Sequence, residues 1–178
     1  MIKIIGGKYN SRIIEAPDEG TVPTKSRVRE AISNALQNEA LNGKALDLFA
    51  GSGALGIQAL SFGAKEAVFV DASKKACQVI SANLSKLKIN GMRVINSDYL
   101  TALKKLEGEE FSLVYLDPPY AEKEYYLNSI KAILEYGLLS QNGAIMLEYE
   151  GDMPYSFPEF SRQKEYNYGR SKVVILRR

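Results

Sequence analysis

The sequence predicts an α/β fold in which helices cover both faces of a mostly parallel β-sheet. Strand-like segments at residues 44–50, 66–71, 92–98 and 111–117 alternate with helix-like segments at 54–63, 73–88 and 99–107. This alternation is typical of parallel strands joined by right-handed helical crossovers. A glycine-rich turn after the first of these strands, and acids at or near the strand ends, favour an open sheet that binds a ligand beyond the carboxyl ends of its strands.

The stretch before this series predicts a hairpin followed by a helix. Strand-like runs at residues 2–5 and 12–16 are joined by GGKYNS, whose glycines and asparagine suit a turn. Over residues 27–38 the apolar side chains recur on one helical face, with Thr24 or Ser26 available as the cap. Later in the chain, residues 125–139 predict another helix, and residues 143–150 and 171–178 predict strands. We therefore expect one domain over residues 1–178, with residues 1–22 as a small N-terminal β-hairpin extension.

Composition excludes several classes of function. At 178 residues and 46% hydrophobic residues, the chain is long enough for one globular domain with a sizeable core. The formal net charge of +2 is too small to indicate nucleic-acid binding by itself. One cysteine and no histidine exclude an internal disulfide, a Cys/His zinc site and histidine-based catalysis. Because no apolar run approaches the ~20 residues of a membrane span and the start lacks a long apolar signal segment, we expect a cytoplasmic protein.

The turn LDLFAGSGALG places Gly51, Gly53 and Gly56 between a strand and a helix. Glycines let a ligand approach the backbone closely, so such turns often hold cofactors. The spacing matches the dinucleotide fingerprint, and Asp71 follows at roughly the 20-residue distance of a ribose-binding acid, so an NAD-dependent oxidoreductase is one alternative. Two observations count against it, because the chain has no room for a separate catalytic domain and the segment DPPY stays unexplained.

The segment FSLVYLDPPY predicts a buried strand that ends at Asp117, two prolines and Tyr120. Pro118 and Pro119 carry no amide hydrogen and fix their own φ, so the chain leaves the sheet in one stiff, extended conformation with its carbonyls pointing outward. The alternative interpretation is a strand-ending turn with Tyr120 packed on the surface.

In this order along the chain, DLFAGSGALG, VFVD, NSD and DPPY resemble the motifs of class I methyltransferases, which use S-adenosylmethionine to methylate exocyclic amines of nucleobases. The resemblance implies a Rossmann-like class I methyltransferase fold with a seven-stranded, mostly parallel sheet. More narrowly, IIGGKYNSRIIEAP, PTKSRVREAISNAL and YGRSKVVIL are similar to the bacterial family that methylates N2 of guanine 966 in 16S ribosomal RNA. An adenine-N6 or other amine methyltransferase and a non-catalytic RNA-binding assembly factor remain alternatives.

The chemistry of amine methylation suits DPPY. The lone pair of a guanine N2 amine is delocalised into the ring, so the enzyme's main task is to orient it toward the methyl group. Asp117 can accept one amine hydrogen and the Pro118 carbonyl the other, while the carboxylate stabilises developing positive charge. Tyr120 offers a ring on which an extruded base can stack. We therefore expect Asp117, Pro118 and Tyr120 to be the catalytic residues, without a metal and without a nucleophilic cysteine, since Cys77 lies in an apolar helical run.

The resemblance also implies which residues bind the cofactor. It assigns the methionine end to Asp47, Ala50, Gly51, Ser52 and Gly53, the ribose hydroxyls to Asp71, and the adenine edge to Asp98 and the Tyr99 amide, with Ala72 and Leu100 as apolar walls and Asp117 bordering both cofactor and base. Taken singly, each acid is better explained as a helix N-cap, and it is the set of acids that indicates a ligand site.

RNA contacts are expected from Lys8, Arg12, Lys25, Arg27 and Arg29 near the N-terminus, and from Arg170 and Lys172 after a YNYG loop. The alternative is that these are solvated surface charges. Tyr9, Tyr166 and Tyr168 either stack on bases or pack on a strand. The partner implied by the resemblance is 16S ribosomal RNA or a small-subunit particle, and we expect a monomer.

Overall fold

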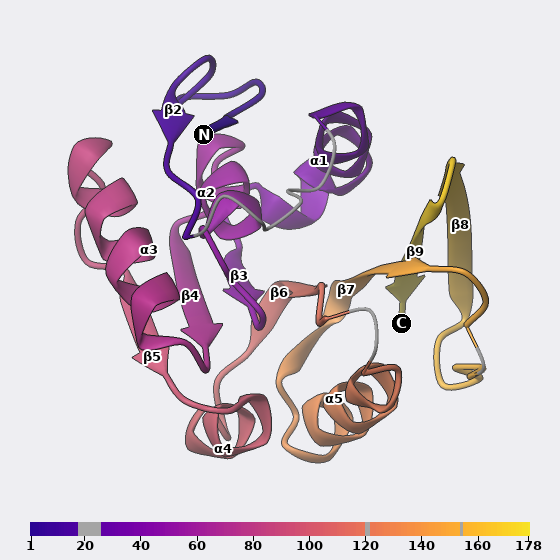
Figure 1. The fold of residues 1–178 in the computed structure, drawn as a ribbon. Helices are drawn as coiled ribbons and strands as arrows, with labels where there is room; N and C mark the ends of the chain where they lie inside the picture. The colour runs from indigo at the N-terminus through magenta and orange to yellow at the C-terminus, as the bar shows by residue number, and fades with distance from the viewer. Residues whose placement is uncertain (18–25, 120–121, 154) are drawn as a thin grey trace.

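The computed structural model describes residues 1–17, 26–119, 122–153 and 155–178, with the side chains of residues 26–28 excluded. A seven-stranded sheet with the strand order β5-β4-β3-β6-β7-β9-β8 dominates it (Figure 1). The strands are β1 (Ile2–Lys3), β2 (Ile13–Ile14), β3 (Lys44–Asp47), β4 (Glu66–Asp71), β5 (Arg93–Asn96), β6 (Phe111–Leu116), β7 (Leu139–Glu150), β8 (Arg162–Tyr168) and β9 (Ser171–Arg177). The helices are α1 (Ser26–Ala40), α2 (Ala54–Ser61), α3 (Lys74–Lys86), α4 (Tyr99–Lys105) and α5 (Glu124–Glu135).

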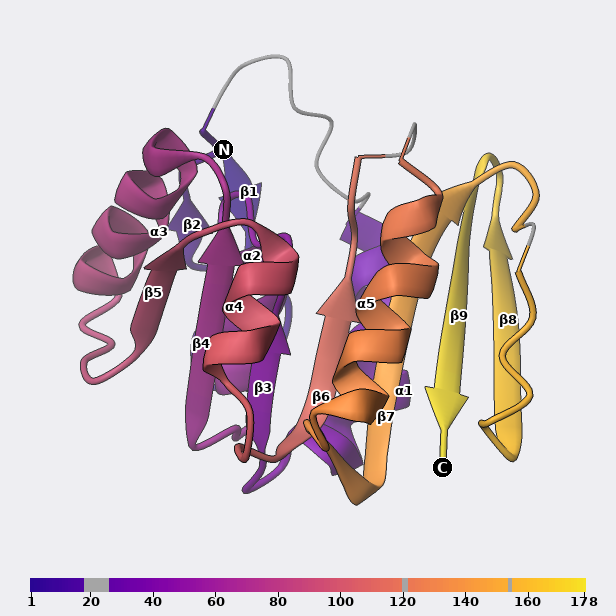
Figure 2. The same ribbon diagram turned by 90° about the horizontal axis from the view of Figure 1, so that it is seen from below.

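Helices cover both faces of the sheet, as predicted (Figures 1 and 2). Strands β3 to β7 run parallel, whereas β9 is antiparallel to both of its neighbours. Because parallel strands are covered on both sides, β4 and β6 are almost continuously apolar and buried. One core layer joins the sheet to α1, α2, α3 and the N-terminal hairpin, and the other joins it to α4 and α5. Among the described residues, no helix is both long and apolar enough to cross a membrane.

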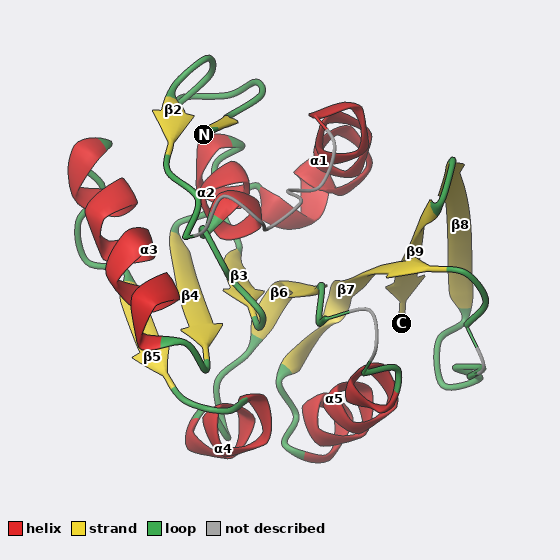
Figure 3. Ribbon diagram, in the orientation of Figure 1, coloured by secondary structure: helices red, strands yellow, loops and turns green. Residues whose placement is uncertain are grey.

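The structure corrects several predicted boundaries (Figure 3). The helix predicted over residues 125–139 ends at Glu135, and strand β7 begins at Leu139 rather than at residue 143. The first strand of the series ends at Asp47 rather than at residue 50, because the chain turns there into the glycine loop. The segment expected to be a YNYG loop is instead the end of strand β8, and only Gly169 and Arg170 form the turn to β9. Strand β8 lacks the apolar alternation of a half-buried strand because it lies at the sheet edge, where β9 is its only hydrogen-bonded neighbour among the described strands and most of its side chains are exposed.

The order of the strands determines where a ligand can bind. From β3 the chain moves outward to β4 and β5, and it then returns to place β6 on the other side of β3. The connections from β3 and β6 therefore leave on opposite faces of the sheet, and open α/β sheets commonly bind their ligands beyond the carboxyl ends of the strands at such a point. The register pairs Asp47 with Tyr115, so Asp117 lies just beyond the same sheet edge as the glycine turn.

The N-terminal hairpin is fastened to the C-terminal half of α2. The side-chain amide of Gln58 donates to the carbonyl of Ile5 and accepts from its N–H. The Ser61 hydroxyl donates to the Gly6 carbonyl and accepts from the Tyr9 N–H. Because β1 and β2 pair over only two residues each, these buried side chains on α2 supply much of the hairpin's attachment.

Four charged side chains form an ion-pair network at the opposite, amino-terminal edge of the sheet. Lys44 contacts Glu66 and Glu109, and Arg93 contacts the same two acids at 3.2 and 2.6 Å. Hydrogen bonding from Arg93, and then from Lys44, lowers the pKa of Glu109 to about 2. The network joins the starts of β3, β4 and β5 to Glu109, which lies two residues before β6.

We expect this network to stabilise the fold most above about pH 5. Glu109 has a lower pKa in the folded state than in the unfolded state, so its contribution is present above the unfolded pKa of 4.5 and is lost as pH falls toward 2. The Glu109→Gln variant should therefore have a lower Tm than the wild type at pH 7, and the difference should shrink between pH 4.5 and 2. Thermal unfolding followed by circular dichroism measures this, with Glu110→Gln as the exposed control. A Tm difference that is equal at pH 7 and pH 2.5 would contradict the assignment.

Candidate active site

Four acids mark the carboxyl edge of the sheet, as the sequence predicted. Asp47 is the last residue of β3 and Asp71 the last of β4, while Asp117 follows β6 directly and Asp98 follows β5 by two residues. Parallel strands bring these positions to one edge.

Asp47 caps helix α2 from the end of strand β3. Its side chain is 2% exposed, and its Oδ2 accepts a hydrogen bond of 2.9 Å from the N–H of Gly56. The helix needs this acceptor because its N-cap residue, Gly53, has a left-handed φ of 78° and no side chain. Burial raises the pKa of Asp47 to about 7, with the Gly56 hydrogen bond opposing the rise and the charge of Asp71 adding to it.

The glycine turn leaves open space above its backbone. Gly51 has a φ of 53°, and among the described residues nothing would lie within 4 Å of a Cβ added there. At Gly56, in contrast, an added Cβ would stand 2.3 Å from the Phe69 ring. The turn therefore combines close packing of α2 on β4 with a backbone that a ligand can approach.

Asp71 holds the turn from the neighbouring strand. Its two carboxylate oxygens accept from the N–H groups of Gly51 and Ser73, each at 2.8 Å. An ionised carboxylate has about four acceptor positions, so Asp71 keeps capacity for ligand hydroxyls. The Cys77 thiol donates to the Asp71 carbonyl at 3.5 Å, and burial raises its pKa, as suits a packed thiol rather than a nucleophile.

Asp98 is the N-cap of α4, so the helix-cap explanation holds for this acid. Its side chain accepts from the Thr101 N–H at 2.9 Å, and hydrogen bonding with Thr101 lowers its pKa. The carboxylate nevertheless faces solvent beside two exposed apolar residues, Ala72 and Leu100, the latter 42% exposed. The side chain of Asn96 connects the strand ends by donating to the carbonyls of Asp71 and Ala72.

Three aromatic side chains form a cluster that sequence reasoning did not identify. The ring of Tyr99 lies 5.4 Å from that of Phe49 and 4.7 Å from that of Tyr125, and Phe49 and Tyr125 stack at 6.0 Å. They come from the turn after β3 and from the first turns of α4 and α5. In the sequence, the signal for this cluster is the position of the three aromatic residues: Phe49 lies just after β3, and Tyr99 and Tyr125 lie at the starts of α4 and α5.

Asp117 and Pro118 directly follow β6, the strand that pairs with β3. Asp117 is half-buried and Pro118 buried, whereas Pro119 is exposed and its carbonyl accepts from the Glu122 N–H at 2.9 Å. Tyr120 lies outside the described residues.

A second residue that the sequence analysis missed is Asn83 on α3. Its side-chain amide donates to the carbonyls of Glu15 and Ser52, and its Oδ1 accepts from the Glu15 N–H, all at 2.9 Å. Asn83 is 1% exposed. It therefore joins the chain that leaves the hairpin to the glycine turn itself.

The predicted RNA-binding residues occupy different environments. Lys8 and Arg12 are exposed on the hairpin, and Arg170 is exposed in the β8–β9 turn. Lys172 is half-buried on the α5 side of β9, 3.6 Å from Asp152. Lys25 lies outside the described residues, as does the side chain of Arg27.

Arg29 requires a correction, because its side chain is buried rather than available on the surface. It is 3% exposed, and the neighbouring charge of Glu148 on β7 favours its charged form while burial lowers its pKa. The helical period explains the error, since Arg29 shares the inward face of α1 with Ile32, Ser33 and Leu36. Arg29 connects α1 to the sheet and does not present its charge to solvent.

Comparisons with known proteins identify a family. The family described as conserved hypothetical protein 95 matches residues 2–177. The Escherichia coli protein named ribosomal RNA small subunit methyltransferase D is 35% identical over 150 residues, covering 84% of this chain and 75% of the relative. YlbH, a candidate rRNA methyltransferase of Bacillus subtilis, is 34% identical and covers 99% of both chains. The solved structure of the E. coli methyltransferase candidate yhhF matches with a TM-score of 0.89 at 31% identity, over 99% of this chain and 97% of that one.

We expect Asn83→Ala to destabilise the protein by about 1–3 kcal/mol, because three backbone groups, the N–H and carbonyl of Glu15 and the buried Ser52 carbonyl, lose their partner. Urea denaturation measures this, with Ser85→Ala on the exposed face of the same helix as the control. Equal stability of the two variants would show that the Asn83 contacts contribute nothing.

Proposed function

This chain belongs to the small-subunit ribosomal RNA methyltransferase D family, and on that premise we propose that it methylates the exocyclic N2 amine of a guanine in 16S ribosomal RNA, guanine 966. Membership of this family implies an S-adenosylmethionine-dependent rRNA methyltransferase; the target atom and the nucleotide are the proposal. The observation that supports the proposal best is the position of Asp47 and Asp117. They lie at the carboxyl ends of the adjacent strands β3 and β6, between which the strand order changes direction.

The residues at this edge fit the cofactor. S-Adenosylmethionine carries a cationic amino group and two ribose hydroxyls, and it supplies an electrophilic methyl group when bound. Asp47 and the open backbone of Gly51 suit the methionine end, together with Ala50, Ser52 and Gly53. Asp71 keeps acceptor capacity for the ribose, and Asp98 and the Tyr99 amide suit the adenine edge beside the exposed Ala72 and Leu100.

Asp117 and Pro118 would orient the target amine. The carboxylate of Asp117 accepts one amine hydrogen and the Pro118 carbonyl the other, so the nitrogen lone pair points at the methyl group. As the amine gains positive charge, the half-buried carboxylate stabilises it. The stiff Pro118–Pro119 pair keeps both acceptors in place. We further propose that Tyr120 stacks on the extruded guanine.

The RNA would reach this edge across the exposed basic residues Lys8, Arg12 and Arg170. Lys25, Arg27 and Lys172 stay in the proposed RNA-binding set, while the buried Arg29 leaves it. We propose that the protein acts as a monomer in the cytoplasm, on free 16S RNA or on a small-subunit particle.

We expect cofactor affinity to rise with pH through the titration of Asp47. At pH 5.5 most of the protein carries the neutral acid, since its pKa is about 7, whereas at pH 7.5 the ionised form dominates and attracts the cationic amino group. If only the ionised form attracts the amino group, the affinity should increase about 25-fold over this interval, in proportion to the ionised fraction. Calorimetry on the wild type and on Asp47→Asn measures it, because the variant keeps an acceptor for Gly56 but does not titrate. Equal pH dependence in both proteins would remove Asp47 from the site.

We expect Asp117→Ala to reduce methyl transfer by ~10² to 10³ while cofactor affinity and Tm stay close to those of the wild type. The assay is single-turnover transfer to small subunits that lack the modification, with the methylated nucleoside identified by mass spectrometry. Tyr120→Phe is the mild companion variant, because it keeps the stacking face.

Each outcome of this assay has a distinct meaning. Near wild-type transfer by Asp117→Ala would contradict the mechanism. If the product is N6-methyladenine, the proposed role of Asp117 in orienting an amine is retained, but the assignment of guanine as the substrate is wrong. Cofactor binding without any transfer by the wild type would favour a non-catalytic assembly factor.

A further inference from the structure

Strand β8 presents a row of cationic and aromatic side chains on one face. The register places Arg162 opposite Arg177, Lys164 opposite Ile175 and Tyr166 opposite Val173. Ile175 and Val173 belong to the core layer on the α1 side of the sheet. Because side chains alternate between faces, the β8 stripe (Arg162, Lys164, Tyr166 and Tyr168) points to this same side.

The aromatic half of the stripe is ordered by internal contacts. The rings of Tyr166 and Tyr168 are nearly parallel, with an interplanar angle of 14° and centroids 6.5 Å apart. The Lys164 ammonium lies 4.9 Å from the centroid of the Tyr166 ring. Both tyrosines pack against the core on one side and are only half-buried. Each therefore keeps part of a rigid ring exposed.

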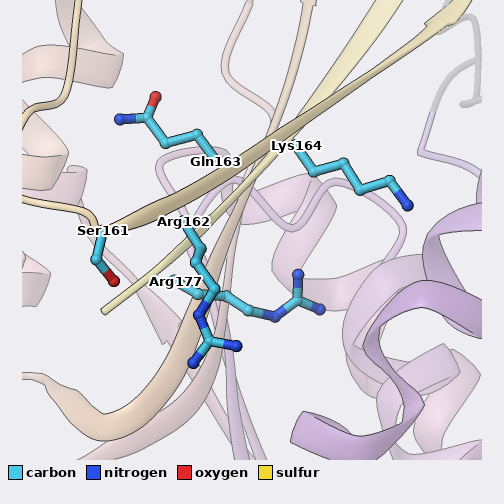
Figure 4. Close-up of a pocket in the computed structure, with 5 residues that line it drawn as sticks. All are labelled: Ser161, Arg162, Gln163, Lys164 and Arg177. Atoms are coloured by element: carbon cyan, nitrogen blue, oxygen red, sulfur yellow. The ribbon is translucent and has the colours of Figure 1, made fainter.

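The cationic half opens into a cavity of about 520 Å³ lined by Ser161, Arg162, Gln163, Lys164 and Arg177 (Figure 4). In Figure 4 the side chains of Arg162, Lys164 and Arg177 extend to one side of the strands, and Gln163 extends to the other. Arg177 is bound by Glu39 and by the Ala35 carbonyl of α1. Arg162 and Lys164 are exposed. Glu165, the acid of this strand, points to the opposite face, where it accepts from the Tyr149 hydroxyl at 2.8 Å.

The stripe leads from the cavity to the edge that carries the candidate active site. Its residues span roughly 20 Å, at about 3.3 Å for each strand residue. Tyr168 pairs with Ser171, which in turn pairs with Glu150 at the carboxyl end of β7. The exposed Arg170 continues the positive charge at the same end. No described helix lies over β8 on this side (Figure 1).

We propose that the β8 stripe is a binding track for a single-stranded segment of the ribosomal RNA that flanks the target base. Phosphates contact Arg162 and Lys164, and unpaired bases stack on Tyr166 and Tyr168. Alternating cations and exposed rings are the chemistry by which proteins hold single-stranded RNA. A simple surface role for the charges, protection of the sheet edge from pairing, requires no exposed rings. This inference rests on the proposed function, because it takes rRNA as the substrate.

The test compares stripe variants of the full-length protein on 16S RNA transcripts and on unmethylated small subunits. Arg162→Ala with Lys164→Ala removes the charges, and Tyr166→Ala with Tyr168→Ala removes the rings. Tyr166→Phe with Tyr168→Phe keeps the ring faces. Lys104→Ala with Lys105→Ala, two exposed lysines on α4 at the other face of the sheet, is the matched charge control.

We expect the ring-deletion pair to weaken RNA binding and raise KM by roughly 5- to 100-fold with kcat and S-adenosylmethionine affinity retained, and the phenylalanine pair to restore binding. The charge pair should make the slope of log affinity against log salt shallower by roughly 1.5, more than the α4 control does. Unchanged KM in the ring pair, or equal salt slopes for the charge pair and its control, would overturn the inference.

The readouts separate this inference from the proposed function. If the product of the wild type is not N2-methylguanine and the stripe variants still lose RNA affinity, the proposed function is wrong but the β8 stripe does bind RNA. If the wild type produces N2-methylguanine and the stripe variants match it in KM and affinity, the track fails and the function stands.

Discussion

The hydrogen bond between the Asp47 carboxylate and the Gly56 N–H is the contact on which the site depends. A turn that leaves its backbone open to a ligand needs glycine at the N-cap of α2, and glycine cannot cap a helix with a side chain. The acceptor therefore comes from the neighbouring strand, which fixes the distance between β3 and the start of α2. The same choice places a buried carboxylate at the centre of the sheet edge, where burial brings its pKa into the physiological range.

The acids at the two edges of the sheet have different partners. At the amino-terminal edge, Glu66 and Glu109 are neutralised by Lys44 and Arg93, and the result is stability. At the carboxyl edge, Asp47, Asp71 and Asp98 are held by backbone N–H groups. A backbone donor orients a carboxylate without cancelling its charge, so Asp47, whose pKa is about 7, favours a cationic ligand in its ionised form.

Regular patterns predicted most of the fold, and the misses have two causes. Apolar periodicity identified the central strands and helices because burial on both faces leaves a strong signal. Arg29 and Asn83 were misjudged or overlooked because each is a polar residue at an inward helical position, next to Ile32 in one case and Ile80 and Leu84 in the other. A polar residue at such a position indicates a buried contact, but the sequence does not give its partner. Strand β8 was missed because an edge strand with one hydrogen-bonded neighbour needs no apolar pattern.

Helix α2 connects the glycine turn to the N-terminal hairpin. All eight of its residues are buried; its N-terminus carries the glycine turn, and its C-terminal half holds the hairpin through Gln58 and Ser61. Asn83 closes a second connection, since it binds the backbone of Glu15 after the hairpin and the Ser52 carbonyl in the turn. The hairpin and the turn are thus fixed to one rigid helix and to each other. The exposed Lys8 and Arg12 are thus carried by a hairpin that Gln58 and Ser61 tie to the same helix as the glycine turn.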